Sequence, residues 1–319
     1  MAPDIRVTDL VSVGHGLDRP EHVMVTRDGR LLASDKSSAI GEVSPDGTLR
    51  RIGAAGGEPN GFAVTATGSH ALVANFGHGL LQQVDLQSGA ITVLARDEAA
   101  GHSIRWINFA LVDSAGAIWA SVCTQNDDLQ DTIRSGRADG LIVRFDPDGS
   151  NPAVVAQDVN FPNCMALDRD EQHLYVVRTV AADVVRYPIG ADRCTLGPQQ
   201  AYGPPLGERR PDEFGAQAAA LMADPAVTRR WGMADGCGFD AAGNLWVTLV
   251  FPNRVVAITP EGQAVTVLED PDGALLKSPT SVAWGGPDLR DVYIGSLASP
   301  YVVKGRSSVP GMPMVHQRD

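Results

Sequence analysis

The chain has 319 residues, and its 38 acidic residues exceed its 26 basic residues, which gives a formal net charge of -12. A protein that binds nucleic acid needs a basic face, so this balance argues against nucleic acid and against an anionic membrane surface as partners. The N-terminus lacks the basic and apolar regions of a signal peptide, and no stretch approaches the roughly 18 apolar residues of a membrane span.

The four cysteines are too widely spaced to form a C-x-x-C pair, so a thiolate zinc site is not expected. We therefore predict a cytoplasmic protein with free thiols. Its partner is expected to be a small-molecule substrate, with no nucleic acid and no membrane.

The first predicted strand lies in residues 5–13, IRVTDLVSV. Six hairpin units follow it, and each unit begins with a polar residue, continues with a short apolar run and turns through Gly or Asp into a second apolar run. The first residues of these units are Glu21, Asn60, Asn108, Asn163, Asp235 and Thr280. Most units continue into a second hairpin, so each unit supplies about four strands.

Four strands per unit, repeated six times, predict an all-β, six-bladed β-propeller in which residues 1–319 form a single domain. The alternative is a β-sandwich, but sandwiches do not repeat a hairpin of this kind six times. The strand in residues 5–13 is predicted to be the outer strand of the last blade, so that the two ends of the chain close the ring.

Two segments interrupt the spacing of the repeat. Residues 124–139 lengthen a connection in the third unit, and a segment of about 208–232 lengthens the connection into the fifth. The second segment is predicted to be helical, because Asp224 and the following proline fit a helix start and Gly232 fits a helix stop. It is expected to cover the face on which the units begin, with Phe214 as a substrate contact.

The six residues that begin the units are predicted to converge on the propeller axis. They include two carboxylates and three amides, and buried carboxylates need compensation. All six side chains offer oxygen, which suits Ca²⁺ with its six to eight oxygen ligands. Because the set contains no His or Cys, zinc and copper are less favoured. Ca²⁺ is therefore expected first, with Mg²⁺, Mn²⁺ and Zn²⁺ as the other candidate divalent cations. For any one of these residues, the alternative is a turn-favouring residue at the start of a strand.

Other polar residues near this set have competing interpretations. His102 lies on a connection toward Asn108 and is either a general base or an exposed loop histidine. Arg178 ends a strand on the same face and contacts either a substrate oxygen or a surface carboxylate. His22 is predicted to point away from the channel by strand alternation and to be structural. Cys164 and Cys237 are expected to be buried packing residues.

At these residues the chain resembles the family of gluconolactonase, regucalcin and luciferin-regenerating enzyme. The resemblance extends over nearly the whole chain. It is carried by the segment around Glu21 and by the segments WINFALVDSAGAIWASVCT, NFPNCMALDRDEQHLYVV, ADGCGFDAAGNLWVT, SPTSVAWGGPDLRDVYIGS and VPGMPM. The more distant diisopropylfluorophosphatase and paraoxonase propellers use a similar Glu, Asn, Asn, Asp calcium set.

The resemblance implies a metal held by Glu21, Asn163 and Asp235, with Asn108 as a further ligand or a substrate contact. It also implies that Asp235 is both a ligand and a possible general base. Asn60 is expected to help orient the substrate carbonyl. The family typically hydrolyses sugar lactones or other cyclic esters, so the resemblance implies a metal-dependent hydrolase.

The chain departs from the family beside Asn108. Sugar lactonases of the family often have an arginine two residues before this asparagine, where this chain has Trp106, with Arg105 one residue further upstream. Both are expected to contact substrate, and the bulky ring favours a substrate more apolar than a sugar lactone. Two other functions stay open: an isomerase or other ring-transforming enzyme that uses the same metal, and a non-catalytic ligand-binding propeller with a structural metal. No G-x-S-x-G motif is present, which argues against a serine hydrolase.

Overall fold

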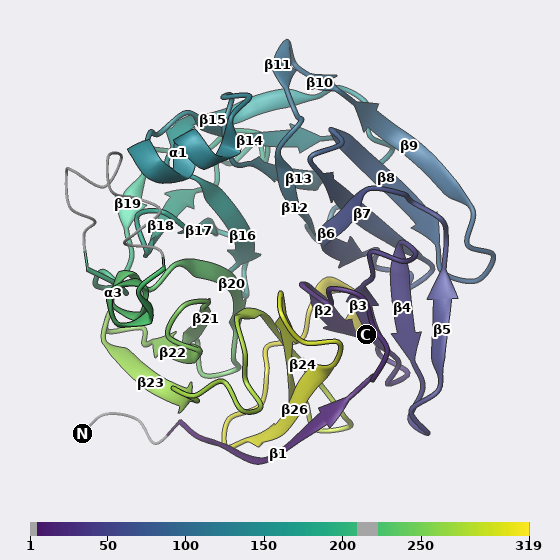
Figure 1. Ribbon diagram of the computed structural model, residues 1–319. Helices are drawn as coiled ribbons and strands as arrows, with labels where there is room; N and C mark the ends of the chain where they lie inside the picture. Colours follow the sequence, from purple (N-terminus) through teal and green to yellow (C-terminus); the bar gives the residue numbers. More distant parts are fainter. Residues whose placement is uncertain (1–4, 209–222, 319) are drawn as a thin grey trace.

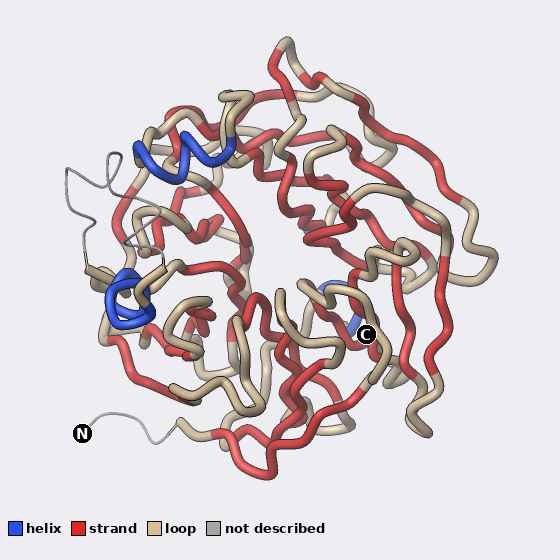
Figure 2. The backbone as a smooth tube through the Cα atoms, in the orientation of Figure 1, coloured by secondary structure: helices blue, strands red, loops and turns tan. Residues whose placement is uncertain are grey.

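The computed structural model describes residues 5–208 and 223–318. In these residues the strands form six antiparallel sheets, arranged as blades around a common axis (Figures 1 and 2). The predicted all-β, six-bladed β-propeller is confirmed. Within the described residues, no helix is both long enough and apolar enough to span a membrane.

The strands of the first three blades run outward from the axis in chain order. Blade one contains β2 (Val23–Val25), β3 (Leu31–Ser34), β4 (Ile40–Val43) and β5 (Leu49–Ile52). Blade two contains β6 (Glu58–Val64), β7 (His70–Phe76), β8 (Leu80–Asp85), β9 (Ile91–Arg96), β10 (Glu98–Ala99) and β11 (His102–Ser103). Blade three contains β12 (Ile107–Val112), β13 (Ile118–Val122), β14 (Gly140–Phe145) and β15 (Ala153–Val159).

The last three blades follow the same plan, except that the final outer strand comes from the N-terminus. Blade four contains β16 (Pro162–Leu167), β17 (His173–Arg178), β18 (Asp183–Pro188) and β19 (Gln200–Ala201). Blade five contains β20 (Ala234–Phe239), β21 (Leu245–Leu249), β22 (Arg254–Ile258) and β23 (Ala264–Glu269). Blade six contains β24 (Pro279–Gly285), β25 (Asp291–Ser296), β26 (Val302–Ser307) and β1 (Val7–Val13).

The ring is closed by the two ends of the chain. β1 pairs antiparallel with β26, with Val7 opposite Ser307 and Val13 opposite Val302. The predicted role of the N-terminal strand is therefore confirmed. Because blade six contains strands from both ends, the first and last parts of the sequence must fold together.

The apolar core lies between neighbouring blades. Met24 of blade one, Phe62 of blade two and Ile118 of blade three belong to one buried cluster, and Trp119 and Val247 belong to a second cluster that joins blades three to five. The innermost strands have neighbours on both faces, which is why β12 and β16 are buried along their whole length.

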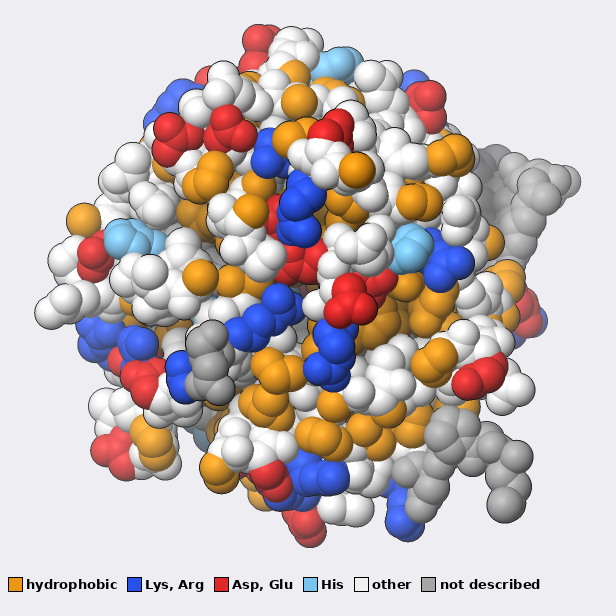
Figure 3. Space-filling view, turned by 180° about the vertical axis from the view of Figure 1, so that it is seen from behind, with side chains coloured by type: hydrophobic (Ala, Val, Ile, Leu, Met, Phe, Trp, Pro, Cys, Tyr) orange, Lys and Arg blue, Asp and Glu red, His pale blue; other side chains and the backbone are white. Residues whose placement is uncertain are grey.

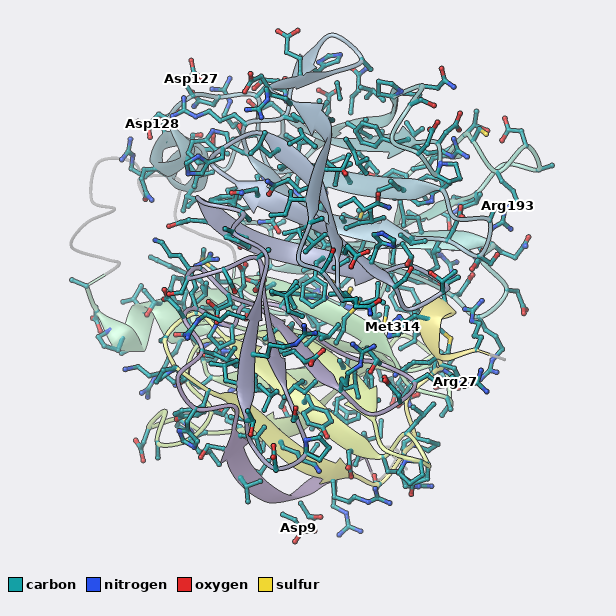
Figure 4. All side chains as sticks on the ribbon, turned by 90° about the vertical axis from the view of Figure 1, so that its right-hand side faces the viewer. Asp9, Arg27, Asp127, Asp128, Arg193 and Met314 are labelled. Atoms are coloured by element: carbon teal, nitrogen blue, oxygen red, sulfur yellow. The ribbon has the colours of Figure 1, made fainter. Side chains whose placement is uncertain are left out.

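Two faces of the propeller differ in what covers them. α1 (Leu129–Ser135) and α3 (Pro225–Trp231) lie on the face where the innermost strands begin (Figure 1). The short 3-10 helix η1 (Val315–Gln317) lies on the opposite side, near Met314 in Figure 4. There the Gln317 amide donates to the carbonyls of Val25 and Trp284, at 2.8 and 2.9 Å. The C-terminal segment thus packs against the far end of the innermost strands, on the face shown in Figure 3.

The helix predicted before blade five is confirmed over its described part. The Asp224 side chain accepts a hydrogen bond from the backbone N–H of Ala226 at 2.9 Å, Pro225 is the first helical residue, and Gly232 follows the helix with φ 76°. The remainder of the predicted insert, including Phe214, lies outside the described residues.

One buried carboxylate stabilises blade five. Asp240, which is 1% exposed, accepts hydrogen bonds from the Trp246 indole N–H at 2.9 Å and from the Asn244 side-chain amide at 2.7 Å. Asp240→Ala leaves both donors buried without this acceptor, at about 1–3 kcal/mol each. We expect the free energy of unfolding, measured by urea denaturation, to fall by roughly 3 kcal/mol.

The matched control is Asp46→Ala, since Asp46 lies in an exposed turn and accepts a hydrogen bond from the Thr48 N–H. Its urea midpoint is expected to stay close to that of the parent protein. Equal midpoints for the two variants would show that the Asp240 hydrogen bonds do not stabilise the blade.

Candidate functional site

A polar cavity lies where the innermost strands of all six blades begin. Its lining includes the six residues that begin the sequence repeats: Glu21, Asn60, Asn108, Asn163, Asp235 and Thr280. These residues are only 1–7% exposed. The space open to the centre of a water-sized atom is about 10 Å³, enough for a single water molecule or ion.

Two glycines allow the strands to converge this closely. A Cβ atom on Gly236, the residue after Asp235, would lie 2.1 Å from the backbone oxygen of Thr280. A Cβ atom on Gly61, the residue after Asn60, would lie 2.9 Å from the backbone oxygen of Asn108. Any other residue at these positions would force the neighbouring blades apart. The Asn-Gly and Asp-Gly pairs of the repeat therefore bring the polar side chains together.

Hydrogen bonds fix the direction of two amides in this cavity. The Asn60 amide nitrogen donates to the backbone oxygen of Asn108 at 3.0 Å, and the Asn163 amide nitrogen donates to the Thr179 hydroxyl at 3.1 Å. Among the described residues, the buried Oδ1 atom of Asn108 has no hydrogen-bond donor. An unsatisfied buried acceptor beside two carboxylates is a position at which a cation would be stabilised.

The two carboxylates are electrostatically unfavourable neighbours. Burial raises the pKa of the Asp235 carboxyl well above its usual range, and the nearby Glu21 raises it further. Burial also raises the pKa of Glu21, while Arg19 acts in the opposite direction. Burial thus disfavours the ionised form of both carboxyls, and a cation bound beside them would favour it.

Arg19 was not expected at this site from the sequence. Its Nη1 atom lies 2.7 Å from Oε2 of Glu21 and donates a hydrogen bond to Oδ1 of Asn60 at 2.9 Å. The signal in the sequence was a basic residue two positions before Glu21 in the connection that leads to the axis. In the described part of the chain, the Arg19 guanidinium thus lies beside one of the two carboxyl groups of the cavity, that of Glu21.

These residues fit a hard divalent cation. Glu21, Asn163, Asp235 and Asn108 would hold it through carboxylate and amide oxygens, the donor set that Ca²⁺ prefers. The described residues contain no group of three His, Cys, Asp or Glu side chains placed to bind a metal. Such a site therefore needs the asparagine oxygens as well as the two carboxylates.

His22 lies at the same cavity, so the prediction that it points away from the channel is wrong. Its ring centroid is 4.8 Å from that of Phe109 and 5.1 Å from that of Phe62. Burial lowers the pKa of His22 to about 3, so the ring is neutral at physiological pH. The regular strand β2 begins only at Val23, which is why simple alternation from Glu21 fails.

Trp106 and Arg105 border a separate groove of about 500 Å³, which also includes Asp127 and Leu129. The Trp106 indole N–H donates to the backbone oxygen of Asn126 at 2.8 Å, and the Arg105 guanidinium lies 4.9 Å from the ring centre of Trp106. Figure 4 shows Asp127 on the same side of the molecule as α1 and α3. The groove therefore opens on the face where the innermost strands begin.

Two other predicted site residues, His102 and Arg178, are not among the residues that line the cavity. His102 lies on β11, the outermost strand of blade two, and is not among the residues that line the cavity. Arg178 forms two hydrogen bonds with Asp183 on the neighbouring strand, at 2.8 and 2.6 Å. The structure thus shows Arg178 in an ion pair within its own blade.

Comparisons with known proteins point to one family. Residues 19–298 match the family described as SMP-30/Gluconolactonase/LRE-like region. The chain is 29% identical to a 6-deoxy-6-sulfogluconolactonase of Pseudomonas putida and 28% identical to a pentonolactonase of Haloferax volcanii, over 59% of this chain in each case. The matches cover 53% and 52% of those proteins, so the chain spans about half the length of these relatives.

The fold agrees with the family match. A gluconolactonase from Xanthomonas campestris superposes with a TM-score of 0.70 at 19% identity, over 97% of this chain and 96% of that one. The family match covers most of the sequence and includes Glu21, Asn163 and Asp235. The chain belongs to the SMP-30/Gluconolactonase/LRE-like family.

Proposed function

We propose that this protein is a divalent-cation-dependent hydrolase of a lactone or a related cyclic ester, with Ca²⁺ as the first candidate cation. The observation that carries the proposal is the cavity in which Glu21, Asp235 and three asparagines converge from five different blades. A propeller that only binds other molecules has no need for two buried carboxylates at its axis. The names of the two lactonase relatives support the same reaction class.

The reaction adds water to a ring ester. The water oxygen bonds to the carbonyl carbon, the bond from that carbon to the ring oxygen breaks, and a hydroxy acid is released. A bound cation supplies Lewis-acid polarisation of the carbonyl and activation of the water. In this reaction Asp235 accepts a proton from the attacking water and returns it to the departing ring oxygen.

The asparagines are proposed to orient the substrate. Asn60 and Asn163 are each fixed by a hydrogen bond from the amide nitrogen, so their oxygens keep a defined direction. Asn108 is buried next to them, and its amide is proposed to contact the substrate carbonyl or the cation. Amides held in this way stabilise developing charge without having to reorganise.

The groove beside Trp106 supports a substrate more apolar than a sugar lactone. Trp106 packs against Phe76 with ring centroids 5.2 Å apart, and Leu129 of α1 borders the same groove. Arg105 covers the Trp106 ring and is itself exposed. We propose that Trp106 and Arg105 contact the substituent on the lactone ring.

A panel of five- and six-membered lactones with either alkyl or polyhydroxyl substituents tests this function. We expect alkyl lactones to be hydrolysed, activity to be lost after a chelator is added, and Ca²⁺ to restore it. Hydrolysis that survives complete chelation would contradict the cation dependence. A panel without any turnover, in a protein that still binds Ca²⁺, would favour a non-catalytic propeller or a ring-transforming enzyme.

A further inference from the structure

Arg19 is held in place from both sides, although it is not itself in a strand. The backbone oxygen of Asp18 accepts a hydrogen bond from Lys36 N at 2.8 Å, and that of Pro20 accepts one from Ser296 N at 2.8 Å. Between them Arg19 has φ 56°, a conformation that residues other than glycine rarely adopt. The connection is therefore fixed to blades one and six at the positions that flank Arg19.

This backbone arrangement brings the positively charged guanidinium of Arg19 to the polar residues of the cavity. Glu21 N donates back to the oxygen of Arg19 at 2.8 Å, which folds the chain tightly between the two residues. The Arg19 side chain is 21% exposed and that of Glu21 is 8% exposed. The pair is therefore mostly shielded from water, where the attraction between opposite charges is strong.

Both partners of Arg19 belong to the proposed cation site or lie beside it. Glu21 is a proposed ligand of the cation. Asn60 lines the same cavity: its Oδ1 atom accepts the hydrogen bond from Arg19, and its amide nitrogen donates to the backbone oxygen of Asn108 in blade three. A divalent cation bound to Glu21 would repel the guanidinium. The guanidinium lies beside Oε2 of Glu21, so a divalent cation bound to this carboxylate would compete with Arg19 for the same negative charge.

We propose that Arg19 is a built-in competitor for the cation site: its guanidinium neutralises Glu21 when the site holds no metal, and it must leave Glu21 before a divalent cation binds. This inference rests on the proposed function. Arg19 would then set the affinity for the cation. It would stabilise the metal-free protein, and it would make the cation bind more weakly than it would to the same oxygen ligands without Arg19.

The test compares Arg19→Gln, Arg19→Lys and the parent protein by calorimetric titration with Ca²⁺ and by thermal unfolding of the metal-free protein. We expect Arg19→Gln to bind Ca²⁺ at least about tenfold more tightly, because a competing charge is gone. The metal-free Arg19→Gln protein is expected to unfold at a lower temperature than the parent. Arg19→Lys, which keeps the charge, is expected to stay close to the parent protein in both measurements.

Arg51→Gln is the matched control, because it removes one positive charge from blade one away from Glu21. The Nε atom of Arg51 lies 3.5 Å from Oδ1 of Asp35, and the Arg51 side chain is 44% exposed. It is expected to change Ca²⁺ affinity little. If the parent protein binds Ca²⁺ and Arg19→Gln binds it equally or more weakly, the inference is wrong and the proposed function stands. If neither protein binds any divalent cation, the cation site of the proposed function is wrong as well.

Discussion

Asp235→Asn is expected to lower kcat for the lactone substrate by at least about 10²-fold, the lower end of what a general base contributes. The change keeps the shape of the side chain and one oxygen ligand but removes the group that accepts the proton. Because amide oxygens also bind Ca²⁺, the variant is expected to retain part of its cation affinity. The measurement is kcat at saturating Ca²⁺, with occupancy checked by calorimetry.

Asp170→Asn makes the same chemical change on an exposed residue of blade four and serves as the control. Its kcat is expected to match that of the parent protein. If Asp235→Asn keeps a near-parental kcat at full Ca²⁺ occupancy, Asp235 acts only as a ligand. The alternative base predicted from the sequence, His102, is not among the residues that line the cavity, so such a result would make Glu21, the other carboxylate of the cavity, the next proton acceptor to test.

The repeating hairpins were sufficient to predict the propeller and the position of its polar residues. The pattern works because a blade must bury both faces, which requires a short apolar strand next to the axis in every unit. One residue at the start of each of those strands then faces the axis. Glu21 and Thr280 were found in this way although neither resembles the asparagines chemically.

Residues outside the regular strands were harder to predict. His22 precedes β2, so the period of two does not apply to it, and it lines the cavity instead of pointing away. His102 lies in β11, a two-residue strand at the outer edge of blade two, and the repeat does not contain this extension. Arg19 depends on a left-handed backbone conformation, which no local pattern indicates.

Glu21→Gln is expected to weaken Ca²⁺ binding by at least about tenfold, because it replaces one of the two carboxylates of the site with a neutral amide. The glutamine keeps an oxygen ligand, so added Ca²⁺ is expected to restore a large part of the activity. Glu21 is not proposed to move a proton, and kcat at saturating Ca²⁺ should therefore change much less than in Asp235→Asn. The measurements are a calorimetric Kd and a titration of activity against Ca²⁺.

Glu58→Gln is the appropriate control for this variant. Glu58 begins β6, only two residues before Asn60, and forms an ion pair with Lys36 at 2.6 Å. Its side chain is 36% exposed, and it is not among the residues that line the cavity. A general loss of negative charge near the axis would weaken Ca²⁺ binding in both variants. If only Glu21→Gln binds Ca²⁺ more weakly, and added Ca²⁺ restores its activity, Glu21 is a ligand. If Glu21→Gln instead has a lower kcat with an unchanged Kd, Glu21 takes part in the reaction itself.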